Sequence, residues 1–270
     1  MSGAARLGPR PRISSHTSLS SLPLTSRCQR AEASIARAGA LNPLVSLSCA
    51  HALTDDLLRS ASLVIVCDAS EGDAVAMAAR VRAANVPVVI SATWAFNGAF
   101  FVDSGASHSF VRVRAGETGG VGGGESAAAA EGVVTRGYKP LADALRADAF
   151  RALDVKFTTP STYAWLAALS AAAGGRLPAA SVDAETGARR AAAITAEIER
   201  LAPGDAARAD VAAIDAVASS AAFELSPVAA IVGGVLANEA IKVVTGKDEP
   251  LSNLFVFDGM GGTGGRVFDV

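Results

Sequence analysis

Cysteine is the residue type with the most recognisable chemistry in this chain, because a thiolate can act as a nucleophile or bind a metal. The sequence contains Cys28, Cys49 and Cys67, with neither CxxC spacing nor the spacing of a disulfide framework. Cys67 ends the apolar stretch SLVIVC, where burial disfavours a thiolate, so we expect a core residue there. None of the three is predicted to be catalytic.

The other groups that could do chemistry are scattered along the sequence. The histidines, at positions 16, 51 and 108, have no second His or Cys at metal-ligand spacing, so no metal site is predicted. The run GGVGGG at 119–124 has the glycines of a phosphate-binding loop, but no predicted parallel strand precedes it and no helix start follows it. We therefore interpret this run as part of a linker.

Composition disfavours two further classes of function. The formal net charge of -2 provides no broad basic field for a phosphate backbone, so the sequence predicts no nucleic-acid partner. The longest apolar run, residues 227–237, is shorter than the roughly 20 residues of a membrane-spanning helix, so no membrane span is predicted. Half of the residues are apolar and only 5% are aromatic, which favours an α/β core of Ala, Val and Leu.

The clearest local pattern is a strand, a helix and a second strand. Residues 62–67 and 86–90 are β-branched runs without alternation, which suit parallel strands buried on both faces of a sheet. Helix-forming residues fill 71–84 between them, so we expect a βαβ unit of a doubly wound sheet. Helical spacing over 27–38 and an apolar run over 44–49 predict a helix, a turn and a strand before this unit.

The middle of the chain is predicted to contain two strands, then a linker and then a helical segment. Residues 98–102 and 108–113 are expected to form two strands that pair with each other in antiparallel fashion. Residues 115–137 are polar and rich in glycine, so they bury too little apolar surface to offset their ordering entropy and are predicted to be a linker. The pattern from 138 to 221 is helical, with one segment opening at Pro160.

The last segment has the most strongly specified helix. Ser226 and Pro227 offer a capping side chain and a preset φ at its start, and Gly246 offers a left-handed end. The intervening stretch VAAIVGGVLANEAIKVVT is apolar on nearly every face, so we expect it to be buried against a sheet. Its glycines would allow close backbone approach, and Glu239 with Lys242 would form its one exposed edge.

Residues 226–260, SPVAAIVGGVLANEAIKVVTGKDEPLSNLFVFDGM, resemble the crossover helix and following strand of the ubiquitin-like activating enzyme (ThiF) family, and the closing FDGM is most similar to the small, non-catalytic subunit of SUMO-activating enzymes. Three further stretches agree in order and spacing: RCQRAEASIARAGALNP, SATWAFNGAFFVDSG and KFTTPSTYAWLAAL. The residues that we take as family markers are Asn97, Gly98, Ser226, Pro227, Gly233, Gly234, Glu239, Asp258, Gly259 and Met260.

The resemblance implies an α/β fold with a Rossmann-like ThiF-type sheet, lacking its first βαβ element, and with a helical insertion. It divides the chain into an unrelated or disordered segment, a first α/β part, a glycine-rich linker, the insertion and a second α/β part, over 1–26, 27–114, 115–137, 138–221 and 222–270. Because the first βαβ element of the family is not recognisable, we expect the sequence to be an incomplete version of a longer protein, or the partner to cover the gap.

The resemblance also implies a heterodimer in the nucleus, with the cytoplasm as a second location. The partner, the catalytic subunit of the SUMO-activating enzyme, would bind ATP and magnesium, adenylate SUMO and then carry it as a thioester. This chain would bind no cofactor by itself, because Ala69 and Ser70 stand where active relatives carry an Asp-Asn pair, and Asp68 lies one position early. Arg30 stands where active relatives place an ATP-contacting lysine.

Other functional interpretations remain open at the level of sequence. The chain could be the inactive half of another ubiquitin-like activating enzyme, such as that for ubiquitin or for neddylation. A non-functional fragment is a second alternative, and a fragment of a Rossmann-type dehydrogenase a third, although no dinucleotide fingerprint is found. The arginine- and serine-rich start is compatible with a transit peptide, with disorder, or with a replacement of family sequence.

Overall fold

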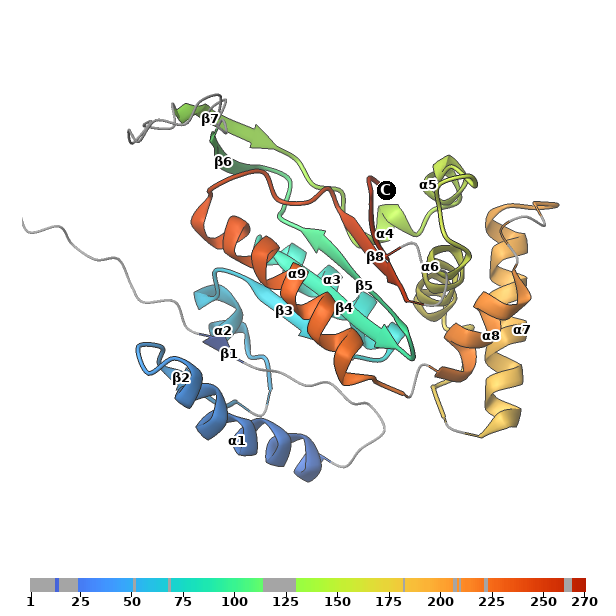
Figure 1. Ribbon diagram of the computed structural model, residues 1–270, viewed down its shortest axis with the longest axis horizontal. Helices are drawn as coiled ribbons and strands as arrows, with labels where there is room; N and C mark the ends of the chain where they lie inside the picture. Colours follow the sequence, from blue (N-terminus) through green and yellow to red (C-terminus); the bar gives the residue numbers. More distant parts are fainter. Residues whose placement is uncertain are drawn as a thin grey trace, which may run out of the picture.

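The computed structural model shows a mixed α/β protein whose main sheet carries helices on both faces (Figure 1). The described residues are 13–14, 24–50, 52–67, 69–113, 130–181, 183–205, 208, 210–220, 223–259 and 264–270. The helices are α1 Leu24–Leu41, α2 Asp55–Ser60, α3 Glu71–Ala83, α4 Leu141–Ala144, α5 Ala147–Ala152, α6 Pro160–Ala173, α7 Ala184–Leu201, α8 Val211–Ser220 and α9 Ser226–Thr245. The strands are β1 Ile13–Ser14, β2 Leu47–Ser48, β3 Val64–Cys67, β4 Val88–Trp94, β5 Asn97–Asp103, β6 His108–Val113, β7 Ala130–Arg136, β8 Leu254–Asp258 and β9 Gly264–Phe268.

The main sheet has the strand order β3-β4-β5-β8-β9. Strands β3 and β4 are parallel and joined through α3, which confirms the predicted βαβ unit, and the remaining neighbours are antiparallel. Helix α3 begins where Ser70 accepts a hydrogen bond from the backbone N–H of Asp73. This mixed sheet is compatible with the Rossmann-like fold expected from the sequence.

Alternation along the central strands divides the core into two layers. Val89, Phe100 and Phe255 point to one face of the sheet, where α9 covers them. Ile90 and Phe101, one residue further along their strands, point to the other face and pack with α3, α6 and the other helices of the 138–221 segment. Figure 1 shows α9 in front of the sheet and α3 behind it. The helical segment thus shares a core with the sheet.

Two contacts fix this helical segment to the sheet. The rings of Trp94 on β4 and Trp165 on α6 stack with centroids 5.9 Å apart, and both side chains are buried. Arg190 on α7 is fully buried and forms an ion pair with Glu71 at the start of α3. Its Nη1 donates to the carbonyl of Pro178 at 2.6 Å and its Nε to the carbonyl of Ala218 at 3.2 Å.

Three expectations about the middle strands need correction. Strands β5 and β6 do not pair with each other, because β5 lies between β4 and β8 while β6 pairs with β7 in a separate two-stranded sheet. Strand β7 comes from the segment predicted to be a linker, and its Val133, Val134 and Thr135 are β-branched residues that suit this pairing. The apolar run at 44–49 contributes only the two-residue strand β2.

Strand β3 is less buried than its apolar sequence suggested. Within the part of the chain that the structure describes, only β4 pairs with it, so it forms an edge of the sheet. Val66 is buried, whereas the side chain of Cys67 is exposed at the end of the strand. The prediction that Cys67 is a core residue is therefore wrong, because an apolar run does not reveal whether a strand has neighbours on both sides.

Helix α9 has the predicted end but a different start and a different environment. Gly246 ends it with φ of 62°, as expected, whereas its N-cap is Leu225, and Ser226 makes no capping bond because it lies inside the helix. One face is buried through Val228, Val232 and three further residues, and the opposite face is exposed. By length and composition alone α9 could cross a membrane, which the sequence analysis did not predict.

The carboxylate of Glu197 on α7 lies at the centre of a charged cluster. It accepts hydrogen bonds from Ser170 Oγ at 2.7 Å, Arg176 Nη2 at 2.9 Å and Arg200 Nη2 at 2.7 Å, and the side chain is 2% exposed. Burial raises the pKa of a carboxyl group, but the bonds from Arg200, Ser170 and Arg176 outweigh burial and lower the pKa of Glu197 to about 2. The ionised carboxylate is therefore the form that stabilises the fold.

We expect stability to fall in acid because of this group. The folded protein binds the proton at Glu197 less readily than the unfolded chain, so the stabilisation is complete above the ordinary pKa of 4.5 and is lost as the pH falls toward 2. Between about pH 6 and about pH 2 the free energy of unfolding should fall by about 3 kcal/mol more in the wild type than in Glu197→Gln. Urea titrations at several pH values measure this, and parallel profiles would contradict it.

Candidate functional site

Several family markers meet at one end of the sheet, where the β4–β5 hairpin lies beside the end of β8. Asn97 begins β5 and pairs with Asp258, the last residue of β8. The backbone N–H of Gly259 donates to the carbonyl of Phe96 at 3.1 Å. Ser161, in the first turn of α6, donates through its hydroxyl to Asp258 Oδ2 at 3.2 Å. The marker residues thus connect the hairpin, β8 and the helical segment.

The side chains of Asn97, Asp258 and Ser161 are buried. Asn97 is 3% exposed, Asp258 6% and Ser161 6%, so their polar groups face the protein interior rather than a ligand. A buried carboxylate that accepts from the first turn of a helix is favoured there by the unpaired N–H groups of the helix start. The arrangement therefore holds elements together, and we assign Asn97 and Asp258 a structural role.

Two of the marker glycines are required by close packing. A Cβ atom on Gly98 would lie 2.8 Å from Cγ2 of Val232 on α9 and 3.1 Å from Cγ2 of Thr93. A Cβ atom on Gly259 would collide with the carbonyl oxygen of Phe96. The NG and DG sequences thus allow α9 and the hairpin to approach their neighbours.

Adding one methyl group at Gly98 should therefore destabilise the fold. We expect Gly98→Ala to lower the free energy of unfolding by about 1–3 kcal/mol, because Val232 and Thr93 must move out of their packed positions. The matched control is Gly72→Ala in α3, where a Cβ atom meets nothing within 4 Å. That variant should change stability by less than about 1 kcal/mol, in the stabilising direction. Guanidinium denaturation compares the two, and equal effects would contradict this account of Gly98.

Glu239 is not part of an exposed edge, contrary to expectation. The side chain is 5% exposed, and its Oε2 accepts the backbone N–H of Leu251 at 2.6 Å. Its Oε1 accepts from Lys242 Nζ at 2.8 Å. Glu239 therefore connects α9 to the loop that leads into β8. The side chain of Glu239 is buried because this loop lies over it.

The remaining markers divide into exposed ones and one that lies outside the described residues. Ser226, Pro227, Gly233 and Gly234 are exposed on α9, and a Cβ atom on either glycine would meet nothing within 4 Å. Within the described part of this chain the two glycines thus do not serve the close approach that was predicted for them. Met260 lies outside the described residues.

The two positions that the resemblance aligns with the magnesium-binding pair of active relatives have structural roles. Ala69 packs against the core, and Ser70 uses its hydroxyl as the N-cap of α3. Arg30 lies in α1, the helix that packs beside β2 through Gly39 and Leu47. Asp68 is outside the described residues. No group of three His, Cys, Asp or Glu residues that could hold a metal occurs among the residues that the structure describes.

Sequence reasoning missed two residues that organise this region. Ser161 stands in the stretch KFTTPSTYAWLAAL and donates a hydrogen bond to Asp258. The available signal was its position beside Pro160, at the start of a predicted helix. Arg190 gave no signal, because the sequence does not show which arginine of the Arg189-Arg190 pair is buried.

Comparison with known proteins gives short matches. No family model matches the chain. It is 58% identical over 41 residues to SUMO-activating enzyme subunit 1A of Arabidopsis thaliana, which covers 15% of this chain and 13% of that protein. These matches support a ubiquitin-like activating enzyme family. Over the same length the chain is 51% identical to SUMO-activating enzyme subunit 1 of Rattus norvegicus and 54% to subunit 1B-1 of Arabidopsis thaliana, covering 12% and 13% of these relatives.

The matched stretch therefore covers only 12–13% of the length of these curated relatives. The mixed sheet and the βαβ unit described above are compatible with a Rossmann-like fold.

Proposed function

We propose that this chain is the non-catalytic subunit of a heterodimeric SUMO-activating enzyme. The observation that carries the proposal is the sequence identity of 51–58% over 41 residues to subunit 1 of such enzymes from a plant and from mammals. In this proposal ATP and magnesium bind at the catalytic subunit, and the thioester with SUMO forms there. The heterodimer acts in the nucleus, and the cytoplasm is a second location.

The chemistry of this chain supports a non-catalytic role. Cys67 lies at the end of an edge strand, and the described residues after it contain no cysteine. The position of the magnesium-binding pair in active relatives is occupied by Ala69 and by the cap residue Ser70. A chain with these residues can support adenylation by completing a partner, rather than by reacting itself.

The exposed face of α9 supports a large protein partner. Ile231 is 46% exposed, Ile241 60% and Val244 45%, and the charged residue beside them, Lys242, is paired with Glu239. Contiguous exposed apolar residues on a long helix are typical of protein interfaces. Gly233 and Gly234, which leave open space beside the helix, would let a partner helix approach closely. We assign this face to the catalytic subunit.

Reconstitution tests the proposed function. The full chain is mixed with the catalytic subunit of a SUMO-activating enzyme, SUMO, ATP and magnesium, and reductant-sensitive conjugates are separated by electrophoresis. We expect a SUMO thioester on the catalytic subunit only, formed at least about tenfold faster when this chain is present. A thioester on this chain, or turnover that does not depend on it, would refute the proposal. Stable pairing with the catalytic subunit for ubiquitin or for neddylation instead would assign the chain to another modifier.

Two variants sharpen this experiment. Ile241→Asp places a charge on the exposed face of α9 and should weaken pairing with the catalytic subunit by at least about tenfold. Val211→Asp is the matched control, because Val211 is 71% exposed at the start of α8, away from α9. Equal pairing by both variants would remove the α9 face from the proposed interface.

A further inference from the structure

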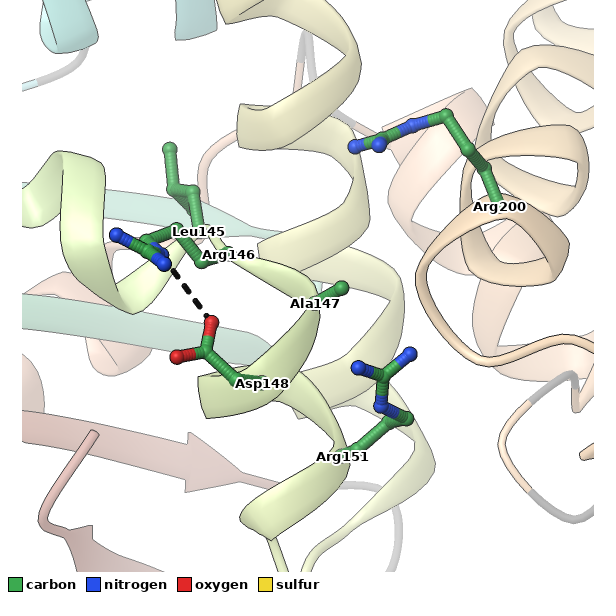
Figure 2. Close-up of a pocket in the computed structure, with 6 residues that line it drawn as sticks. All are labelled: Leu145, Arg146, Ala147, Asp148, Arg151 and Arg200. Atoms are coloured by element: carbon green, nitrogen blue, oxygen red, sulfur yellow. Dashed lines mark hydrogen bonds and ion pairs between the residues drawn. The ribbon is translucent and has the colours of Figure 1, made fainter.

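A hollow of about 530 Å³ between α5 and α7 gathers positive charge on a chain whose net charge is -2. We call it the arginine hollow, and it is lined by Leu145, Arg146, Ala147, Asp148, Arg151 and Arg200 (Figure 2). It contains three arginines and one acid. None of its residues belongs to the family markers at the end of the sheet.

Two of the arginines, Arg151 and Arg200, border the hollow from different helices. Figure 2 shows the Arg200 side chain of α7 above Ala147 and the Arg151 side chain of α5 below it, while Arg146 turns toward Asp148. The Nε of Arg146 donates to Asp148 Oδ1 at 3.2 Å, so the one acid of the hollow is occupied by the third arginine. Arg151 thus has no counter-ion among the residues that line the hollow, and Arg200 is paired with Glu197, which lies outside the lining.

Hydrogen bonds to the protein hold the guanidinium groups of Arg151 and Arg200 in place. Arg200 donates through Nε and Nη2 to Glu197, at 3.1 and 2.7 Å, and Arg151 donates through Nη1 to the carbonyl of Leu201 at 3.2 Å. A guanidinium has five N–H donors in a fixed planar arrangement, so each keeps donors for a second acceptor. Because their positions are already fixed, little side-chain entropy is lost when an oxyanion binds.

The shape of the hollow selects a peptide over an enclosed small molecule. Its floor contains Leu145, which is buried, and Ala147, whereas its rim is open, with Arg146 66% and Arg200 53% exposed. A shallow site with an apolar floor and an arginine rim matches the way acidic motifs of proteins are recognised. Enclosed pockets, in contrast, cover most of the surface of a small ligand.

We propose that the arginine hollow binds an acidic segment of a protein partner, with a carboxylate held between Arg151 and Arg200 and the stem of its side chain on Leu145 and Ala147. Glu197 does not oppose this, since Arg176 shares its carboxylate with Arg200 and the group is buried. Binding should weaken with added salt because the rim is exposed to solvent.

Fluorescence anisotropy with the full chain tests the proposal. The probe is a labelled peptide of about ten residues that alternates Glu and Ser, and the comparison peptide replaces Glu with Gln. We expect the acidic peptide to bind at least about tenfold more tightly than the neutral one at low salt. The double variant Arg151→Gln and Arg200→Gln should weaken the acidic peptide about tenfold, and Arg146→Glu, whose side chain supports no other element, should weaken it in the same direction.

The matched control is Arg189→Gln, because Arg189 lies on α7, is exposed, and is about 16 Å along the helix from Arg200. It should leave the dissociation constant within about twofold. Equal affinity for the acidic and neutral peptides, or equal weakening by Arg189→Gln, would overturn the proposal. Inorganic phosphate should not displace the peptide at about 10 mM, and displacement would show that an isolated oxyanion, rather than a peptide, is the ligand.

Discussion

Replacement of Arg190 by Ala is expected to lower the free energy of unfolding by about 3–5 kcal/mol. The side chain is fully buried and is the ion-pair partner of Glu71, so its loss leaves a half-buried carboxylate without that partner. It also leaves the carbonyls of Pro178 and Ala218 without their donor. Domains are commonly stable by only about 5–15 kcal/mol, so this loss is a large fraction of the total. Urea denaturation followed by circular dichroism measures it.

The neighbouring arginine provides the control. Arg189 is exposed, and its Nη2 donates to Thr186 Oγ1 at 3.1 Å, so Arg189→Ala should cost less than about 0.5 kcal/mol. Arg190→Lys should also be strongly destabilising, because one ammonium group cannot reproduce the planar set of donors that Arg190 directs at three acceptors. A cost below about 1 kcal/mol for Arg190→Ala would contradict the role of this residue in joining α7 to α3.

Replacement of Trp165 by Ala is expected to cost about 3–5 kcal/mol of folding free energy. Trp165 is 3% exposed and stacks on Trp94, so truncation opens a cavity between α6 and the sheet. The helical segment should become the first part of the chain to lose protection, which hydrogen exchange detects in α6 and α7 before the central strands.

Two variants separate stacking from general damage to the helix. Trp165→Phe keeps an aromatic ring and should recover more than half of the lost stability. Phe157→Ala removes an aromatic side chain that is 55% exposed just before α6, and should cost less than about 1 kcal/mol. If Trp165→Ala left hydrogen exchange in α6 unchanged, the stack would not be what fixes this segment to the sheet.

Local features of the fold followed from the sequence because their causes are local. The βαβ unit was predicted from two β-branched runs and a helical stretch of suitable length, and it formed as expected. Gly246 ended α9 because only a residue that tolerates positive φ can occupy that position without strain. These signals depend on residues a few positions apart.

Features that depend on distant neighbours could not be predicted in the same way. Helix α9 is apolar on both faces, yet the sheet covers only the face with Val232 and Leu236, so composition could not tell which side would be buried. Strand β7 needed β6 as a partner, and its own segment appeared too polar to be ordered. Glu239 was judged exposed because the loop that covers it begins several residues later.

The candidate site was predictable to a similar degree. Gly98 and Gly259 were singled out only as family markers, and the structure places both against backbone or side-chain atoms. Their meeting at one end of the sheet depends on the register between β5 and β8, which no short stretch encodes. Ser161 joins them from α6, more than 60 positions from Asn97.

The stack of Trp94 on Trp165 also has an optical consequence. The protein has only two tryptophans, and their nearly parallel indoles lie close enough for their electronic transitions to couple. The near-ultraviolet circular dichroism of both chromophores therefore depends on whether the two rings remain stacked. The native chain therefore carries an intrinsic, label-free reporter of whether α6 is seated on β4.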